Sequence, residues 1–284
     1  MSLLRNRKTP RAPHQRSKLL NLTDPGLAAI NTTLVSRRPF EFDWANEVSE
    51  PAWAVYSKAM EAVRSAAVPF MLGGGFALAA FTGRWRDTKD IDFYILPADR
   101  DAAVGALSQA GFADYFSVRA YDRKWIYRST RSGVIVDIIW AMANQRAQVD
   151  ELWFERAGSV RVRDEQVKVV PLEEFMWCKL YIMQRDHCDW PDLFNLLYAV
   201  GPRLDWAHLV RRLEEDLPVL KGLLSVYSWL CPRNARKLPA SLWRRLGLRR
   251  ALGVSMKPKR DHIRLFDSRY WFAALGPSGR KLEV

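Results

Sequence analysis

The sequence has few cysteines and no long hydrophobic stretch. Its three cysteines, Cys178, Cys188 and Cys231, cannot all pair with one another and lack the spacing of metal ligands. No apolar run approaches the roughly 20 residues that a membrane-spanning helix needs, and no apolar stretch near the N-terminus predicts a secretory signal. We therefore expect a cytoplasmic protein with reduced thiols, and neither a membrane protein nor a disulfide-stabilised one.

Two common glycine signatures of nucleotide-binding proteins are also absent around the glycine triplet at residues 73–75. No Lys-Ser or Lys-Thr pair follows to make a P-loop, and Leu78 stands where a dinucleotide fingerprint has its third glycine. The triplet instead joins an apolar strand, expected at 68–72, to a helix, expected at 76–81. Such a turn lets the backbone approach a ligand, and the free N–H groups of the helix favour an anion. The alternative is a tight turn with a structural role only.

Two aspartates, Asp90 and Asp92, follow in a run of β-forming residues. Because strand side chains alternate between faces, both carboxylates point the same way, roughly 6.6 Å apart along the strand. Like charges on one face repel each other unless a cation lies between them. Two Mg²⁺ ions about 3.5 to 4 Å apart, as used in phosphoryl and nucleotidyl transfer, would supply that positive charge.

A third aspartate, Asp137, is the one charged residue in the apolar, β-branched run at 133–140. A carboxylate buried in such a strand without a partner costs several kcal/mol or becomes protonated. Asp137 therefore needs a cation, a hydrogen-bond donor or a catalytic role. A salt bridge to an arginine such as Arg128 is the structural alternative.

The glycines and the first two aspartates belong to a longer pattern, Gly74-Gly75-x-Ala77, then Gly83, then Arg86-x-Thr88-Lys89-Asp90-Ile91-Asp92. This pattern resembles the signature of the nucleotidyltransferase superfamily related to DNA polymerase β. The pattern resembles especially the small bacterial branch of this superfamily, which includes the minimal nucleotidyltransferases, the nucleotidyltransferase toxins of toxin–antitoxin pairs and the aminoglycoside nucleotidyltransferases. The resemblance is specific for fold and reaction type and nearly silent about the acceptor.

The resemblance implies a Mg²⁺-dependent enzyme that moves a nucleoside monophosphate from an NTP such as ATP to an acceptor hydroxyl and releases pyrophosphate. In that superfamily a third acidic residue on a neighbouring strand completes the metal site, and Asp137 fits that place and would help to deprotonate the acceptor. The implied site residues are Asp90, Asp92 and Asp137 for two Mg²⁺ ions, Gly74 and Gly75 for the β- and γ-phosphates, and Arg84, Arg86 and Lys179 for the leaving pyrophosphate.

A second segment, Lys179-x5-Arg185-Asp186-x2-Asp189-x2-Asp192, also resembles the toxins, in which a helical lysine followed by Arg-Asp and a further Asp lies near the nucleotide. An ammonium on a helix flank can reach a charged ligand. The alternative for Lys179 is a solvated position on a helix face. The three aspartates are spaced by three residues, which groups them on one helix face, where they would pair with Arg185 or cap the helix that begins near Pro191. We interpret His187 as structural.

The net charge of +13 is concentrated at the two ends of the sequence. Residues 1–20 hold six basic side chains and no acidic one, and residues 231–264 hold eleven against Asp261 alone. The remainder is slightly acidic, so the expected catalytic part is not itself basic. Basic ends suit a nucleic-acid backbone or another polyanion. The alternative is that they only increase solubility.

Alternating strands and helices predict an α+β fold, with a mixed sheet like the polymerase β palm and helices on one side of it. Strand-like runs are expected at 115–121, 124–129 and 133–140, with a hairpin at 159–170. Four parts follow from this organisation: a basic, partly disordered N-terminal arm at 1–45, a nucleotidyltransferase core at 46–170, a helical domain at 171–230 and a basic C-terminal extension at 231–284.

The acceptor stays open at this point. The basic ends favour RNA, such as a tRNA end, and a toxin-like enzyme would use RNA or a protein. An aminoglycoside-like antibiotic would need an acidic pocket, for which Asp186, Asp189 and Asp192 are the obvious supply. A non-catalytic nucleic-acid-binding module on the same fold is a reading from another class, and the presence of all three acidic positions argues against it.

Overall fold

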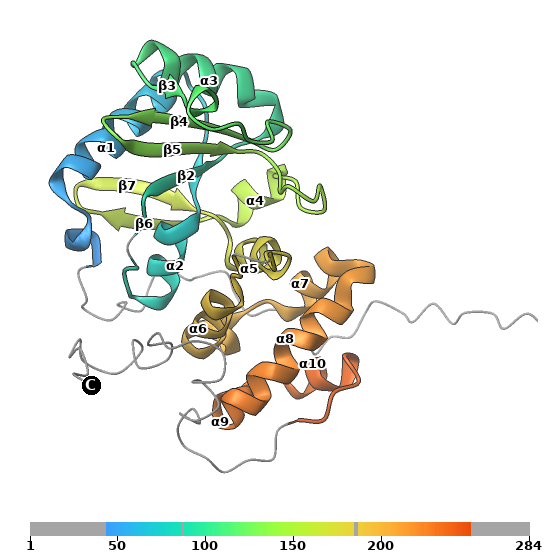
Figure 1. Cartoon of the computed structure of the whole chain (residues 1–284). Helices are drawn as coiled ribbons and strands as arrows, with labels where there is room; N and C mark the ends of the chain where they lie inside the picture. Colours follow the sequence, from blue (N-terminus) through green and yellow to red (C-terminus); the bar gives the residue numbers. More distant parts are fainter. Residues whose placement is uncertain (1–43, 87, 185–186, 251–284) are drawn as a thin grey trace, which may run out of the picture. The chain divides into compact units, whose positions relative to one another are not determined.

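The computed structural model describes residues 44–250, except for residues 87 and 185–186. The expected arm at 1–45 and the extension at 231–284 therefore lie largely outside the described residues. Within them the fold is α+β, as predicted, with a mixed sheet of seven strands in the order β3-β4-β5-β2-β1-β7-β6 (Figure 1). No helix in the described part of the chain is long and apolar enough to cross a membrane.

The sheet places the aspartate-bearing strand near its centre. Its strands are β1 (Met71–Leu72), β2 (Asp90–Tyr94), β3 (Ala113–Asp114), β4 (Ile126–Arg131), β5 (Val134–Ile139), β6 (Gly158–Val162) and β7 (Glu165–Val169). Strand β2 runs antiparallel to β1 and parallel to β5, and β5 in turn pairs antiparallel with β4. The register sets Asp92 beside Asp137, and Asp137 beside Arg128.

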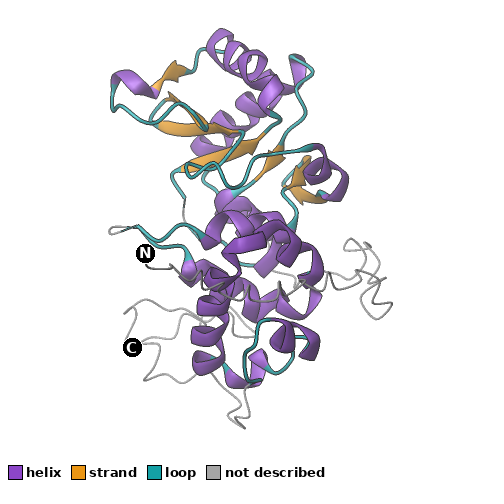
Figure 2. Cartoon of the chain, turned by 90° about the vertical axis from the view of Figure 1, so that its right-hand side faces the viewer, coloured by secondary structure: helices purple, strands orange, loops and turns teal. Residues whose placement is uncertain are grey.

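The helices are α1 (Glu50–Ser65), α2 (Gly74–Thr82), α3 (Arg100–Gln109), α4 (Glu151–Arg156), α5 (Leu172–Leu180), α6 (Trp190–Val200), α7 (Trp206–Leu213), α8 (Leu217–Leu230), α9 (Pro232–Ala235) and α10 (Ala240–Arg245). The helix expected at 76–81 is present as α2 and is longer by two residues at its start and one at its end. Helix α1 starts after Ser49, whose hydroxyl accepts from the Ala52 N–H, and has Pro51 in its first turn. After β7 every named element is a helix (Figure 2).

Helices pack against both faces of the sheet, so our prediction of helices on one side only is wrong. On one face, Ile91 and Phe93 of β2 belong to the buried cluster that includes residues of α1 and α3. On the other face, Tyr94 stacks on Trp153 of α4, with the ring centroids 5.8 Å apart. The apolar run of β5 explains this, because a strand that is apolar at almost every position must be covered on both faces. Asp90, Asp92 and Asp137 lie on the Tyr94 face.

The run at 115–121 does not form the expected strand. Residues Tyr115–Ser117 form a short 3₁₀-helix, and only β3 pairs at this edge of the sheet. The cause is local: the Asp114 carboxylate accepts a hydrogen bond from the Phe116 N–H at 2.8 Å and so closes a turn. The side chains of Phe116 and Val118 are exposed as a result.

Candidate active site

Three carboxylates from β2 and β5 converge at one place. One oxygen from each of Asp90, Asp92 and Asp137 can be chosen so that all three atoms lie within 4.8 Å of one another. The alternation of β2 puts Asp90 and Asp92 on one face, and the parallel register brings Asp137 beside them. The Thr88 hydroxyl donates to Asp90 at 2.5 Å and orients it. We call these three aspartates the carboxylate triad.

The glycine turn touches the triad. A Cβ at Gly74 would overlap the Asp92 carboxylate, and the residue has a φ of +49°, so a side chain is excluded by both space and conformation. The Gly73 N–H donates to the Asp92 carbonyl oxygen at 2.9 Å, and Gly73 precedes α2 with no side-chain cap. The N-terminus of α2, which favours negative charge, thus lies beside the aspartates.

The triad fits a hard divalent cation by its chemistry. Carboxylate oxygens are the ligands that Mg²⁺ and Mn²⁺ prefer. Burial raises the pKa of Asp92 well above its usual value, and the charges of Asp90 and Asp137 raise it further, although Lys179 and Arg128 oppose them. A bound cation would favour the ionised form instead. The residues that can hold such ions are therefore Asp90, Asp92 and Asp137.

Asp137 forms the predicted salt bridge to Arg128 and also lies in the carboxylate triad. The Asp137 side chain is 1% exposed and accepts two hydrogen bonds from the Arg128 guanidinium, at 2.8 Å from Nε and 2.5 Å from Nη2. The same Nη2 lies 3.9 Å from Asp90 Oδ2. Burial raises the pKa of Asp137, and the hydrogen bonds from Arg128 counteract this shift. Asp137 thus belongs to the triad and is also paired with Arg128.

Lys179 is buried and not solvated. Its Nζ lies 2.6 Å from Asp189 Oδ2 and 2.9 Å from Asp192 Oδ2. Burial lowers the pKa of Lys179, but the two carboxylates outweigh it and the net shift is upward. Asp189 and Asp192 are thus grouped, as their spacing predicts, but around Lys179 and not around Arg185, which with Asp186 lies outside the described residues.

The remaining predicted residues lie next to this ion cluster or on the loop after α2. Arg86 Nη2 is 3.4 Å from Asp192 Oδ2, and the Arg86 side chain is 55% exposed. Arg84 is partly buried, and burial lowers its pKa. His187 Nε2 lies 2.9 Å from Asp189 Oδ1, in keeping with a structural interpretation. Contacts of Arg84, Arg86 and Lys179 with a pyrophosphate stay predictions.

Sequence reasoning missed a second buried ionic group, on α5 and α7. Glu174 Oε1 lies 2.5 Å from His208 Nε2 and 3.3 Å from Arg212 Nε. Arg212 also binds Asp150 through two hydrogen bonds, at 2.6 and 3.0 Å. The available signal was a pair of acidic residues, Glu173 and Glu174, at the start of a helix whose other residues, apart from Lys179, are apolar. Their partners lie too far along the sequence to be read from spacing.

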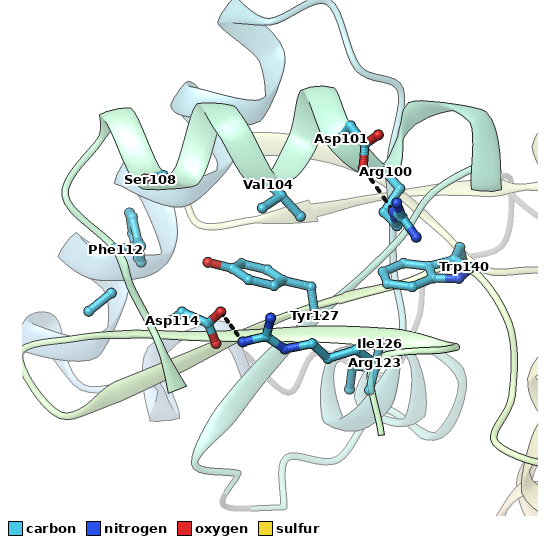
Figure 3. Close-up of a pocket in the computed structure, with 11 residues that line it drawn as sticks. Arg100, Asp101, Val104, Ser108, Phe112, Asp114, Arg123, Ile126, Tyr127 and Trp140 are labelled. Carbon is cyan, nitrogen blue, oxygen red and sulfur yellow. Dashed lines mark hydrogen bonds and ion pairs between the residues drawn. The ribbon is translucent and has the colours of Figure 1, made fainter. Parts of the chain in front are cut away.

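A hollow lies on the opposite face of the sheet, between α3 and β4. It has a volume of about 530 Å³, and its lining includes Val104, Phe112, Tyr127 and Trp140. Figure 3 shows its two rim arginines, Arg100 and Arg123, paired with Asp101 and Asp114. No triad residue lines it, because Tyr127 and the triad point to opposite faces.

A comparison with solved structures finds several distant matches. The solution structure of the antibiotic-resistance factor ANT(2″)-Ia is 15% identical and covers 62% of this chain and 97% of that one, with a TM-score of 0.44. The lincosamide antibiotic adenylyltransferase LnuA is 15% identical over 52% of this chain and 96% of that one, with a TM-score of 0.37. JHP933 from Helicobacter pylori is 18% identical over 63% and 79%, with a TM-score of 0.34. At these values the similarities carry no argument about fold, reaction or acceptor.

A comparison with curated proteins finds no significant match. The profile of one protein family, described as uncharacterised nucleotidyltransferase, matches residues 54–225, which is more than half of the chain. The matched segment contains the glycine turn, the whole triad, Lys179 and both of its carboxylate partners. The chain therefore belongs to this family of nucleotidyltransferases.

Proposed function

We propose that this protein is an enzyme that transfers a nucleoside monophosphate from an NTP to an acceptor hydroxyl and releases pyrophosphate, with two Mg²⁺ ions bound by the triad. One observation carries the proposal: oxygens of Asp90, Asp92 and Asp137 come within 4.8 Å of one another beside a glycine turn that has no room for a side chain. Family membership supports the same reaction class.

In the proposed reaction the acceptor oxygen forms a bond to the α-phosphorus while the bond from that phosphorus to the bridging oxygen of the β-phosphate breaks. The electron pair leaves with pyrophosphate. When bound, Mg²⁺ lowers the pKa of the acceptor hydroxyl and neutralises the phosphate charge. Asp137 accepts the hydroxyl proton, since a carboxylate oxygen that binds Arg128 keeps a second lone pair.

The chain's other groups hold the triphosphate in this proposal. The backbone N–H groups of Gly74 and Gly75, at the start of α2, bind the β- and γ-phosphates. Arg84 and Arg86 lie on the loop that joins α2 to β2 and neutralise the leaving pyrophosphate. Lys179 contributes its positive charge to the pyrophosphate site without direct contact, because its ammonium already binds Asp189 and Asp192. Catalysis then comes from positioning and charge neutralisation.

The test is transfer of label from each α-³²P-labelled NTP to a cell lysate, with Asp90→Asn compared with the intact protein. We expect Asp90→Asn to abolish transfer and to leave the circular-dichroism spectrum unchanged. Asp101→Asn is a matched control, since Asp101 is an exposed acid of α3 whose one ion pair among the described residues is with its neighbour Arg100. Substantial transfer by folded Asp90→Asn protein would count against the assignment.

We infer that the acceptor is RNA, because a basic surface follows α8. Between residues 231 and 250 no acidic residue occurs, and seven basic side chains are exposed: Arg233, Arg236, Lys237, Arg244, Arg245, Arg249 and Arg250. None of the seven forms an ion pair with another described residue. A phosphate backbone suits this unbalanced positive charge. A cationic antibiotic fits less well, since Asp189 and Asp192 are engaged by Lys179 and leave no open acidic pocket between them.

The acceptor class is tested by asking where the label goes. We expect label on RNA, and we expect Arg244→Gln/Arg245→Gln/Arg249→Gln to weaken RNA binding and to flatten its salt dependence. Lys58→Gln/Arg119→Gln/Lys124→Gln is the control, because it removes the same charge from exposed positions elsewhere. Label on protein or on small molecules alone would exclude RNA but would leave the nucleotidyl-transfer reaction intact.

A further inference from the structure

Arg128 is the one cation that an ion pair joins to the triad in the described part of the chain. Its guanidinium faces both oxygens of Asp137, which is almost fully buried, and lies within 4 Å of Asp90. The β4–β5 register puts Arg128 directly opposite Asp137, so the contact follows from strand pairing. Two of the three carboxylates thus share one guanidinium, Asp92 has no ion pair among the described residues, and the local charge balance stays negative.

The backbone of Arg128 is itself fixed from the edge of the sheet. The Tyr121 hydroxyl accepts from the Arg128 N–H at 3.0 Å and lies 3.2 Å from the Arg128 carbonyl oxygen. It also lies 3.1 Å from Asp114 Oδ1. Residues 115–121 do not pair as a strand, but the Tyr121 hydroxyl connects this segment to β4 by hydrogen bonds. These hydrogen bonds fix the backbone from which the Arg128 guanidinium reaches Asp137.

We propose that Arg128 is a positioning residue that keeps Asp137 in place before a metal ion binds and that competes with the ion for this carboxylate. The inference rests on the proposed metal-dependent function. A bidentate guanidinium takes one lone pair of each Asp137 oxygen, and its positive charge near Asp90 and Asp137 repels a divalent cation. The triad is thereby pre-assembled, and its affinity for metal is held low.

The test is Mn²⁺ binding to the full chain without nucleotide, measured by calorimetry and by electron paramagnetic resonance. Removing a positive charge beside a carboxylate changes its proton affinity by roughly 10- to 1000-fold, and we expect a change in the same direction for a divalent cation. We therefore expect Arg128→Met to bind Mn²⁺ at least about tenfold more tightly than the intact protein. Arg128→Lys, which keeps the charge and loses the fork, should fall between them. Unchanged or weaker binding by Arg128→Met would overturn the proposal.

Arg131→Met is the matched control. Arg131 lies on the same strand but donates to the Ala110 carbonyl oxygen and not to the triad. We expect its Mn²⁺ affinity to equal that of the intact protein. Arg128→Met also leaves Asp137 buried and unpaired, so its melting temperature should be lower without metal and should rise more steeply with Mn²⁺ than that of the intact protein. A rise no steeper than that of the intact protein would contradict competition.

Two further variants separate this inference from the proposed function. In Arg128→Met/Asp137→Asn the gain in Mn²⁺ affinity should disappear, because the carboxylate in dispute is gone. Asp90→Asn/Asp92→Asn should abolish Mn²⁺ binding whatever residue 128 is. If this double variant still bound Mn²⁺ like the intact protein, the proposed metal site would be wrong. If it lost binding and Arg128→Met gained none, only the competition would be wrong.

Discussion

Two buried ionic groups in this molecule differ in their charge balance. At the junction of α5 and α7, Glu174 is completely buried and has both His208 and Arg212 within hydrogen-bond distance. In the triad, Asp90 and Asp137 share Arg128, and Asp92 has no ion pair among the described residues. In the first group both partners meet one oxygen of Glu174, Oε1, and lie on α7, as expected of a group that holds two helices together, while Oε2 is buried without a hydrogen-bond partner in the described residues. The second has more negative charge than its partners neutralise, as expected of a site that awaits a cation.

The largest expected effect is a loss of nucleotidyl transfer when the glycine turn beside the triad is changed. The Glu174 group has no such turn. In Gly74→Ala the new Cβ would overlap the Asp92 carboxylate and would strain a backbone at positive φ. We expect nucleotidyl transfer to fall by more than about 100-fold, since misplacement by about 1 Å costs that much. Labelled-NTP assays measure the loss.

Gly105→Ala is the control for this change. Gly105 lies within α3, and a Cβ there would meet no atom within 4 Å. We expect transfer at the level of the intact protein and slightly greater stability, because alanine favours a helix over glycine. Equal activities of Gly74→Ala and Gly105→Ala would show that the turn does not serve the triad.

The next largest effect is a loss of stability when the Glu174 group is disrupted. Glu174→Ala removes a fully buried carboxylate and leaves His208 and Arg212 without it. We expect the free energy of unfolding to fall by about 3 to 5 kcal/mol, measured by urea unfolding. Mn²⁺ affinity should not change. Glu155→Ala, at an exposed position of α4, should change neither quantity.

The triad should respond in the opposite direction. Asp92→Asn removes a carboxylate that is buried and repelled by Asp90 and Asp137, so the free energy of unfolding of the metal-free protein should rise at pH 8. Saturating Mn²⁺ should reverse the order, since only the intact triad binds the ion. A loss of stability in metal-free Asp92→Asn protein would mean that the triad is a structural group like that of Glu174.

The part of the site that follows from local sequence was predictable. Strand alternation put Asp90 and Asp92 on one face, and the lone acid in an apolar strand marked Asp137. The partners of these residues were harder, because they depend on register and packing between elements. Arg128 was one candidate among the arginines until the β4–β5 pairing set it opposite Asp137. Lys179 carried no signal that Asp189 and Asp192 would enclose it.

The wrong strand at 115–121 has the same kind of cause. Its aromatic and β-branched residues favour a strand, but Asp114 closes a turn on the Phe116 N–H, and Tyr121 bonds the backbone of Arg128 through its side chain. A side-chain hydrogen bond to the backbone competes with strand pairing in a way that residue composition does not reveal. The hydroxyl of Tyr121 instead connects this segment to the triad through Arg128.

The smallest expected effect is a pH dependence of stability. The pKa of Asp92 in the folded, metal-free protein lies well above the value of 3.8 that the unfolded chain has. The folded state therefore holds its proton to higher pH, and the stability contributed by protonated Asp92 is lost as pH rises from about 4 through the folded-state pKa. Urea unfolding of metal-free protein at a series of pH values should show this decline, and Asp92→Asn should flatten it. Saturating Mn²⁺ should flatten it too, because the ion favours the ionised carboxylate, whereas Glu174→Ala should leave the decline in place. The same dependence of unfolding free energy on pH in the intact protein, Asp92→Asn, the Mn²⁺-saturated protein and Glu174→Ala would mean that the excess negative charge of the triad has no effect on folding. The two buried groups would then differ only in the residues that compose them.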